Sequence, residues 1–301
     1  MEKLITVLTA TYNRAHLLPD LYQSLCRQTC QLFDWVIVDD GSTDNTEKLI
    51  VNWISMPHQF QIEYIKKENG GKNRAINDGV KLVNTPYTMI VDSDDYLTDD
   101  AIDFLTNVSD SVLKENKIAG VAGLRGTDIN TPIKIPLVPP NEYITASNLE
   151  RRAYNLESDA CEVYKTDILL SHPFFVWPHE KYLPEEVVWN QLALEGYCLR
   201  WYNRVTCIVR YQQGGITRES WLVLRNNPMN YAMMFNHHLL TCSSIKSQFY
   251  NALQFVSCCF LGKEPGYILN CNNKLLAIIL FFPGWLLSKR RLLQIKCYCL
   301  N

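Results

Sequence analysis

Three carboxylates follow a short apolar segment in the first third of the chain. Residues 87–91 have the apolar and β-favouring composition of a buried strand. Asp92, Asp94 and Asp95 come directly after them. Carboxylates this close repel one another unless something neutralises them, and a hard divalent cation prefers oxygen ligands. The stretch therefore predicts a site for a cation that also grips a diphosphate. The alternative is a solvated acidic turn that caps the helix beginning near Thr98.

Three other predicted strands, residues 4–9, 35–38 and 62–65, also end in polar clusters. The strands alternate with helical patterns of about a dozen residues, which is typical of βαβ units and a mostly parallel sheet. The carboxyl ends of parallel strands share one edge of the sheet, where open α/β folds bind ligands. We therefore expect these side chains to lie near the acidic cluster: Thr11, Tyr12, Asn13, Arg14, Asp39, Asp40, Asn69 and Lys72.

Two of these side chains have roles that follow from their positions. Asp39 ends a strand and is suited to bind a base or ribose; the alternative is an N-cap or turn residue. Lys72 begins a helix, where backbone N–H groups and the helix dipole add to its charge, so it is suited to a phosphate. The alternative is a solvated lysine.

Composition excludes several classes of protein. A chain of 301 residues predicts one large or two modest domains, and 47% hydrophobic residues suffice for a core. The formal net charge of −2 argues against nucleic-acid binding. The eleven cysteines form no CxxC pair, and the N-terminus lacks a signal-peptide pattern. We therefore expect reduced cytosolic thiols, and the cysteine spacing gives no support for a zinc site.

The first hundred residues resemble the nucleotide-binding half of a family 2 glycosyltransferase with the GT-A fold, of the type that builds bacterial cell-surface polysaccharides. Four motifs in order carry the resemblance: residues 7–14, 36–46, 69–72 with Ala75 and Asn77, and 90–95. The resemblance implies a GT-A fold, which is Rossmann-like with a mostly parallel sheet flanked by helices. It also implies a nucleotide-sugar donor, with a uridine nucleotide as the expected carrier.

The resemblance also assigns residues to the donor site. Asp92 and Asp94 form the DxD motif that holds Mn²⁺ or Mg²⁺, with Asp94 on the metal and Asp92 nearer the ribose. Asp95 faces the donor sugar. The nucleobase and ribose are held by Thr11, Tyr12 and Asp39. The full implied nucleotide-sugar set is Thr11, Tyr12, Asn13, Arg14, Asp39, Asn69, Lys72, Asp92, Asp95 and Arg218.

One position departs from the family pattern. Many relatives carry Ala-Arg-Asn where this chain has Ala75, Ile76 and Asn77. We expect the charges of Lys72 and Arg74 to replace that arginine at the phosphates.

An acidic pair, Glu185 and Glu186, precedes an amphipathic helical pattern. Pro184 fits a first helical turn, and the helix dipole favours acids there, which is the structural alternative to catalysis. Members of the resembled family have an acidic pair at this point, one of which deprotonates the acceptor hydroxyl. The resemblance implies Glu186 as the base and Glu185 as its structural or acceptor-binding neighbour. Arg218 follows two glycines in a segment suited to close over a diphosphate, or to form a surface turn.

The C-terminal third differs in composition from the rest of the chain. Residues 275–287 are an apolar stretch interrupted by Pro283 and Gly284, and it is shorter than the roughly 20 residues that cross a bilayer. Residues 242–301 carry seven Lys and Arg against one acid, Glu264. This pattern predicts a helical segment on an anionic membrane surface. The alternative is a helical hairpin packed on the catalytic domain.

These observations predict a GT-A catalytic domain over residues 1–220 and a helical, partly membrane-associated extension over residues 221–301. Within the domain, residues 1–97 bind the nucleotide sugar and residues 98–220 bind the acceptor, with residues 124–143 as a specificity loop. The expected enzyme is an inverting, metal-dependent hexosyl- or N-acetylhexosaminyl-transferase. It acts on a glycan or lipid-linked glycan in the cytoplasm, peripheral to the inner face of the cell membrane.

Three rival functions remain open. A nucleotidyltransferase requires a Gly-rich phosphate loop after the first strand, where this chain has Thr-Tyr-Asn-Arg. A receiver-type signalling module leaves Glu185, Glu186 and the basic C-terminal segment without a role. The third rival is a non-catalytic relative that binds a nucleotide sugar or glycan.

Overall fold

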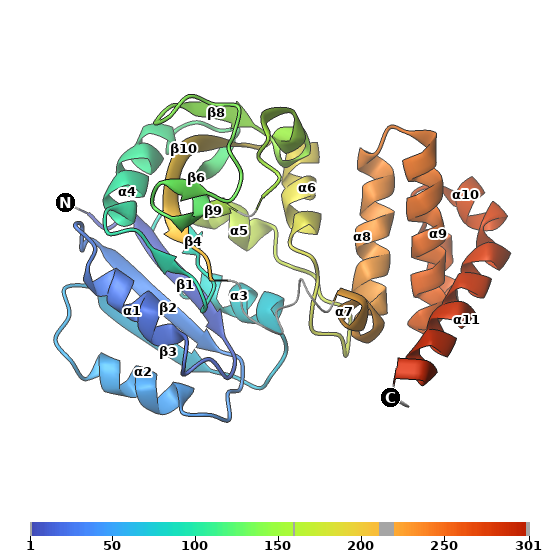
Figure 1. Cartoon of the computed structure of the whole chain (residues 1–301), viewed down its shortest axis with the longest axis horizontal. Coiled ribbons are helices and arrows are strands. Elements are labelled where there is room, and N and C mark those ends of the chain that lie inside the picture. Colours follow the sequence, from blue (N-terminus) through green and yellow to red (C-terminus); the bar gives the residue numbers. More distant parts are fainter. Residues whose placement is uncertain (1, 159, 211–219, 299–301) are drawn as a thin grey trace. The chain divides into compact units, whose positions relative to one another are not determined.

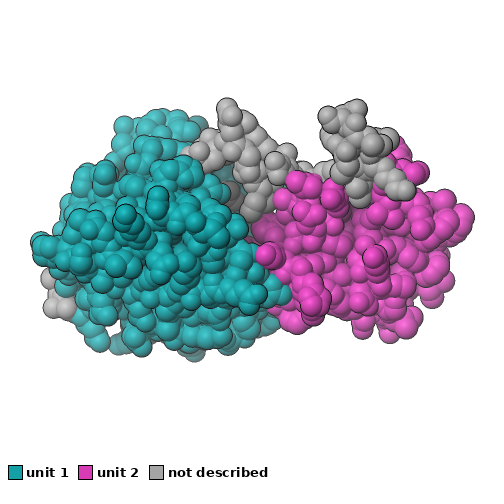
Figure 2. All heavy atoms as spheres, turned by 90° about the horizontal axis from the view of Figure 1, so that it is seen from below, with its two compact units in different colours: residues 1–174, 191–211 teal, residues 175–190, 212–301 magenta. Residues whose placement is uncertain are grey.

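The computed structural model describes residues 2–158, 160–210 and 220–298. The chain forms two compact units, coloured separately in Figure 2. The first unit comprises residues 1–174 and 191–211, and the second comprises residues 175–190 and 212–301. The functional division predicted at residue 220 stays a prediction.

Four parallel strands make up one half of the sheet in the first unit (Figure 1). Their order is β3-β2-β1-β4, so the chain starts in the middle of this half and builds outward on both sides. The parallel arrangement predicted from the strand–helix alternation is confirmed for these strands. They are β1 (Ile5–Thr11), β2 (Phe33–Asp39), β3 (Gln61–Lys66) and β4 (Tyr87–Ile90).

The other half of the sheet is mixed, which corrects the prediction of a mostly parallel sheet. β9 runs antiparallel to both β4 and β6, and β10 runs parallel to β6 but antiparallel to β5 and β8. The segment between β6 and β9 contains strands and a 3₁₀ turn but no α-helix, so it does not impose the parallel return of a βαβ unit. The strands are β5 (Tyr96–Leu97), β6 (Ile118–Asp128), β7 (Thr131–Pro132), β8 (Tyr143–Ala146), β9 (Ala160–Lys165) and β10 (Cys198–Ile208).

Helices cover both faces of the sheet. α1, α2 and α4 bury side chains such as Leu21, Trp53 and Ile102 in the same core as Trp35 and Ile37 of β2. α3 packs on the opposite face, where its residue Gly79 lies against Leu8 and Val38. These contacts use alternate residues of β1 and β2, as a strand buried on both faces requires. The helices of this unit are α1 (Leu18–Cys26), α2 (Thr46–Ile54), α3 (Lys72–Val80), α4 (Ala101–Val112) and α5 (Thr166–Ser171). A further helix, α6 (Glu186–Leu194), has residues in both units.

The second unit is helical and has its own core. α8 and α9 run side by side (Figure 1) and bury Met229, Ala232, Phe255 and Val256. The first part of this unit forms two helices and not one, because Pro228 is favoured at a first helical turn and not within a helix. The helices are α7 (Ser220–Asn226), α8 (Pro228–Thr241), α9 (Ile245–Leu261), α10 (Lys274–Ile279) and α11 (Phe281–Tyr298), with a 3₁₀ turn at Pro265–Asn270.

Within the ranges that the structure describes, no helix has both the length and the apolar composition that crossing a bilayer requires.

Candidate active site

The first two strands bring their polar ends together at one edge of the sheet. In the β1–β2 register Thr11 lies opposite Asp39, and Asp40 N donates to Thr11 O at 2.8 Å. β4 adjoins β1 on its other side, and Val91 N donates to Leu8 O at 3.0 Å. The acidic cluster after β4 therefore emerges from the sheet next to the residues that follow β1.

Asp39 is fully buried and held from two sides. Its Oδ1 accepts from Ser42 N at 2.7 Å, and its Oδ2 accepts from Tyr64 Oη at 3.0 Å. Burial and the neighbouring Asp39 carboxylate raise the pKa of Tyr64, so its hydroxyl stays a donor at neutral pH. Thr11 Oγ1 is buried nearby and has no hydrogen-bond partner among the described residues. This rigid polar site has the character that recognition of a nucleoside requires.

The turn after β1 is tied to the loop after β2. Asn13 has a φ of 54°, and its Oδ1 accepts from Thr43 N at 2.8 Å and Asp44 N at 3.3 Å. Arg14 N donates to Thr46 Oγ1 at 3.3 Å. Asn13 thus organises two site loops, whereas Tyr12 beside it is 46% exposed and available to a ligand.

Asp40 positions the loop that precedes α3. Its carboxylate accepts from Gly70 N at 2.8 Å and Gly71 N at 2.7 Å, and Asn69 Nδ2 donates to its carbonyl at 2.8 Å. Gly71 has a φ of 96°, which a side chain would disfavour. This loop places Lys72 as the first residue of α3.

Three cationic side chains lie within 4 Å of the three carboxylates. Lys72 Nζ is 2.6 Å from Asp92 Oδ1. Arg125 Nη2 is 3.4 Å from Asp92 Oδ2, and Arg125 Nη1 is 3.3 Å from Asp95 Oδ2. The third pair is the longest, with Arg14 Nη1 at 3.9 Å from Asp94 Oδ2.

The carboxylates differ in their protonation. Burial disfavours the charged form of Asp92, but Lys72 and Arg125 outweigh it and hold the pKa of Asp92 well below its usual range. Burial raises the pKa of Asp95 to about 7, because Arg125 only partly offsets it and Asp92 and Asp94 repel a further negative charge. The environments of these neighbours therefore push their pKa values apart, as is common in functional sites.

Arg125 is a site residue that the sequence analysis missed. It lies on β6, its side chain is only 15% exposed, and it contacts two of the three carboxylates. Its signal in the sequence was a lone arginine inside the apolar run that β6 forms. The sequence analysis placed Arg125 in the specificity loop predicted over residues 124–143.

A divalent cation fits this cluster only together with phosphate oxygens. Within the described part of the chain, no three His, Cys, Asp or Glu side chains are grouped as a metal site. Mg²⁺ in phosphoryl sites commonly uses one or two carboxylates, with substrate phosphates and water as the other ligands. Asp94 and Asp92 supply such hard oxygen donors, and the side chain of Asp94 is 29% exposed.

Glu185 and Glu186 lie in the second unit at the start of α6. Glu185 O accepts from Val188 N at 3.0 Å, so this residue caps the first turn. Glu186 is exposed, and its Oε1 lies 3.4 Å from Nε2 of His238 in α8. The predicted phosphate ligand Arg218 falls outside the described residues. The catalytic roles of these residues stay predictions.

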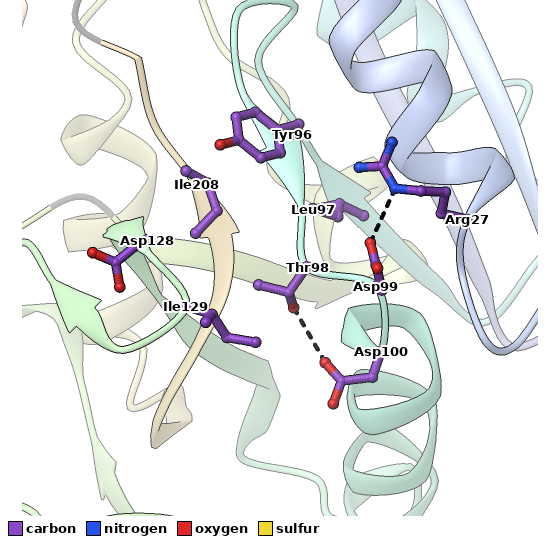
Figure 3. Close-up of a pocket in the computed structure, with 9 residues that line it drawn as sticks. All are labelled: Arg27, Tyr96, Leu97, Thr98, Asp99, Asp100, Asp128, Ile129 and Ile208. Atoms are coloured by element: carbon purple, nitrogen blue, oxygen red, sulfur yellow. Dashed lines mark hydrogen bonds and ion pairs between the residues drawn. The ribbon is translucent and has the colours of Figure 1, made fainter.

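A pocket of about 470 Å³ lies in the first unit beside β5 (Figure 3). Tyr96 and Leu97, which follow the acidic cluster, line it together with Asp128 and Ile129 from the predicted specificity loop. The rim is polar: Arg27 Nε is 3.2 Å from Asp99 Oδ1. The remaining lining residues are Thr98, Asp100 and Ile208. None of the predicted donor-binding residues that the structure describes lines this pocket.

Comparison with known proteins gives evidence on the family and on the fold of this chain. Residues 6–112 match the family model of glycosyl transferase family 2. Over 258 residues the chain is 25% identical to the poly-beta-1,6-N-acetyl-D-glucosamine synthase of Staphylococcus epidermidis, covering 77% of this chain and 60% of the synthase. The curated relatives are covered over only 14% to 60% of their own length.

Two solved structures have the same fold. The S. aureus TarS 1-349 complex with UDP-GlcNAc superposes with a TM-score of 0.58 at 17% identity, covering 93% of this chain and 79% of that one. The mannosyltransferase PcManGT from Pyrobaculum calidifontis, in complex with GDP-Man and Mn²⁺, gives 0.56 at 14% identity, covering 97% and 84%. The mixed sheet with flanking helices is therefore a fold that both of these solved structures share.

Proposed function

Residues 6–112 belong to glycosyl transferase family 2, and from this premise we propose that the chain is an inverting, metal-dependent sugar transferase. The donor is a nucleoside-diphosphate sugar, and the two solved structures with this fold were obtained with UDP-GlcNAc and GDP-Man. One observation carries the proposal: the buried Asp39 and the acidic cluster after β4 emerge at one edge of the sheet.

The residues after β1 and β2 are the proposed nucleoside site. Asp39 accepts hydrogen bonds from the ribose or base, since its carboxylate is already oriented by Ser42 and Tyr64. Thr11 Oγ1 offers a buried hydroxyl that lacks a partner among described residues. Tyr12 provides an exposed aromatic face on which a base can stack. A uridine carrier remains an expectation from family resemblance.

The cationic residues are the proposed diphosphate site. Lys72 begins α3, where its charge and the helix N-terminus both favour phosphate. Arg14 is 35% exposed and lies nearest to Asp94. A bound Mn²⁺ or Mg²⁺, held by Asp94 and Asp92, would supply positive charge to the leaving diphosphate. Asp95 faces the donor sugar in this assignment, with Arg125 as its partner.

Glu186 is the proposed general base. The acceptor O–H bond breaks as its proton passes to the carboxylate, and the oxygen forms a bond to the anomeric carbon. The bond from that carbon to the diphosphate breaks, so configuration inverts in one displacement without a second nucleophile. General-base help of this kind contributes about 10²–10⁴-fold to the rate. Glu185 is assigned to the structure or to acceptor binding.

The acceptor is proposed to be a glycan or lipid-linked glycan of cell-surface polysaccharide synthesis. A poly-beta-1,6-N-acetyl-D-glucosamine synthase among the relatives supports a hexosyl or N-acetylhexosaminyl product. We place the protein in the cytoplasm on the inner face of the membrane, because the basic, apolar C-terminal segment suits that surface.

Donor turnover tests this function. The chain is incubated with a panel of UDP- and GDP-sugars and Mn²⁺, and nucleotide release is measured with and without glycan acceptors. Asp94→Ala should abolish release, whereas Asp99→Ala, an exposed carboxylate five residues further on, should leave it unchanged. Nucleotide release that persists at the wild-type rate in Asp94→Ala would contradict the proposal.

A further inference from the structure

The side of α11 that contacts α9 carries small and polar residues. α11 packs on α9 through Gly284, Ser288 and Arg291, which are four and three residues apart and share one face. A Cβ atom added at Gly284 would lie 2.5 Å from the nearest atom of α9. Ser288 is 2% exposed, and Arg291 donates to Ser257 Oγ at 3.1 Å and also to Gln254. Small and polar groups therefore fill this helix contact.

The other side of these helices carries large apolar side chains. Phe282, Leu286 and Leu293 follow one another at four and seven residues, and they are 63%, 48% and 64% exposed. In α10, Leu276 is buried whereas Ile278 is 73% exposed. We name this surface the α10–α11 face; it consists of Leu275, Ile278, Ile279, Phe282, Leu286 and Leu293. An exposed apolar surface of this kind is typical of an interaction site.

Basic and aromatic groups accompany the α10–α11 face. Lys289 and Arg290 are exposed on α11 between Leu286 and Leu293. Lys289 Nζ lies 5.6 Å from the centroid of the Trp285 ring. Glu264 is the single acidic residue in the sixty C-terminal positions, 242–301, of the sequence. The partner of this face should therefore combine an apolar layer with negative charge.

We propose that the α10–α11 face binds an anionic lipid bilayer, with its apolar side chains among the acyl–headgroup boundary and its basic groups at the phosphates. A second copy of the chain fits less well, since a two-fold contact would bring Lys289 and Arg290 of both copies together. This inference specifies which surface makes the membrane contact that the proposed function assumes. It rests on the proposed function only for the biological purpose of that contact.

Vesicle sedimentation of the full chain tests the surface without donor or acceptor. The vesicles contain either phosphatidylcholine alone or equal parts of phosphatidylcholine and phosphatidylglycerol. The wild type should bind the anionic vesicles more strongly than the neutral ones. The double variant Phe282→Ser, Leu286→Ser should lower partitioning by about tenfold or more, because both apolar groups are lost. The matched control Val51→Ser, Ile54→Ser removes side chains that are 53% and 45% exposed on α2 in the first unit, and should bind like the wild type.

Charge variants check the electrostatic part. Lys289→Gln and Arg290→Gln should each weaken binding by about fivefold at low salt, and high salt should reduce this difference. Wild-type protein that does not bind anionic vesicles would overturn the inference. Equal losses of vesicle binding in the apolar double variant and in the control double variant would overturn it too. A dimer that dissociates only in Phe282→Ser, Leu286→Ser would assign the face to a second copy. Calorimetric UDP binding by the same samples separates these outcomes from failure of the proposed transfer function.

Discussion

At the scale of residues, the acidic cluster is balanced by protein cations. Lys72 and Arg125 both contact Asp92, and Arg125 also reaches the more deeply buried Asp95. A single guanidinium thus bridges two carboxylates that otherwise repel each other, and Lys72 adds a second positive charge beside Asp92. This arrangement keeps the loop after β4 in place when no diphosphate is bound. Arg125 is therefore expected to matter for stability as well as for donor binding.

Arg125→Gln should lower the free energy of unfolding by about 1–3 kcal/mol, because it removes the ion-pair partner of the buried Asp95 while Asp92 keeps Lys72. Urea denaturation measures the change. Arg204→Gln serves as the control, since Arg204 pairs with Asp100 at the surface and should cost less than about 1 kcal/mol. Adding Asp95→Asn to Arg125→Gln should restore part of the loss. If the two changes in the free energy of unfolding simply add, Arg125 and Asp95 do not stabilise each other.

Tyr64→Phe should weaken UDP binding by about tenfold, because Asp39 loses one of the hydrogen bonds that orient it. Burial and the Asp39 charge raise the pKa of Tyr64, so the hydroxyl donates throughout the neutral range. Titration calorimetry gives the dissociation constant. Tyr22→Phe removes a hydroxyl that contacts His58 and should leave binding unchanged. Equal affinities for wild type and Tyr64→Phe would mean that Asp39 does not orient the nucleoside.

The site was readable from sequence where the ligand side chains follow directly on strands. Thr11, Asp39 and Asp92 are of this kind, since a strand pattern places its last residue at the sheet edge. Tyr64 and Arg125 lie within strands, and their contacts depend on register and on which strand is the neighbour. A single sequence gives neither the strand register nor the identity of the neighbouring strand, so these two partners of the site carboxylates were missed.

At the scale of elements, β1 to β4 were predicted because each is a short run of apolar or β-favouring residues, whereas the two-residue strand β5 (Tyr96–Leu97) was missed. The strand β10 (Cys198–Ile208) lacks the short apolar pattern that marks β1 to β4 in the sequence. Arg200, Asn203 and Arg204 interrupt its apolar pattern. The strand is nevertheless stable because it pairs with β6, β5 and β8, so tertiary pairing overrides local composition.

One element in the second unit depends on a buried acid. Glu180 accepts from Met229 N and Asn230 N, each at 2.7 Å, and so satisfies the first turn of α8. Glu180→Ala should destabilise the chain by about 1–3 kcal/mol, since two buried backbone donors lose their acceptor. Glu142→Ala, an exposed acid in the first unit, is the control. Chemical denaturation with helical circular dichroism measures both.

The same residue gives a pH dependence with a defined sign. Burial raises the pKa of Glu180 more than its two backbone hydrogen bonds lower it. The folded state therefore binds this proton more tightly than the unfolded chain does. The stability difference between wild type and Glu180→Ala should be largest below the ordinary Glu pKa and should fall as pH rises through the raised value. A difference that grows with pH would show that the charged form is favoured in the folded state.

At the scale of the whole molecule, the described residues include two cores that share no residue. The first contains Trp35, Ile37 and Leu105, and the second contains Phe255 and Val256. The sequence indicated a change of composition near residue 221. It did not indicate that residues 175–190, which carry the proposed base, group with the C-terminal helices. That grouping arises from packing between distant segments, such as Trp177 N donating to Asn230 Oδ1.

Because the two cores are separate, we expect a bound nucleotide to stabilise the first unit more than the second. The proposed nucleoside residues all lie in the first unit, so UDP should slow amide exchange in β1 and β2. At a ligand concentration of one hundred times the dissociation constant, the expected gain is about 2.7 kcal/mol for amides that exchange by unfolding of that core. Amides of α9, whose side chains fill the second core, should exchange at the same rate with and without UDP. Hydrogen exchange with mass spectrometry resolves these segments, and adenosine, which lacks the diphosphate, is the control ligand. Equal protection of α9 and β1 would mean that the chain unfolds as a single cooperative unit.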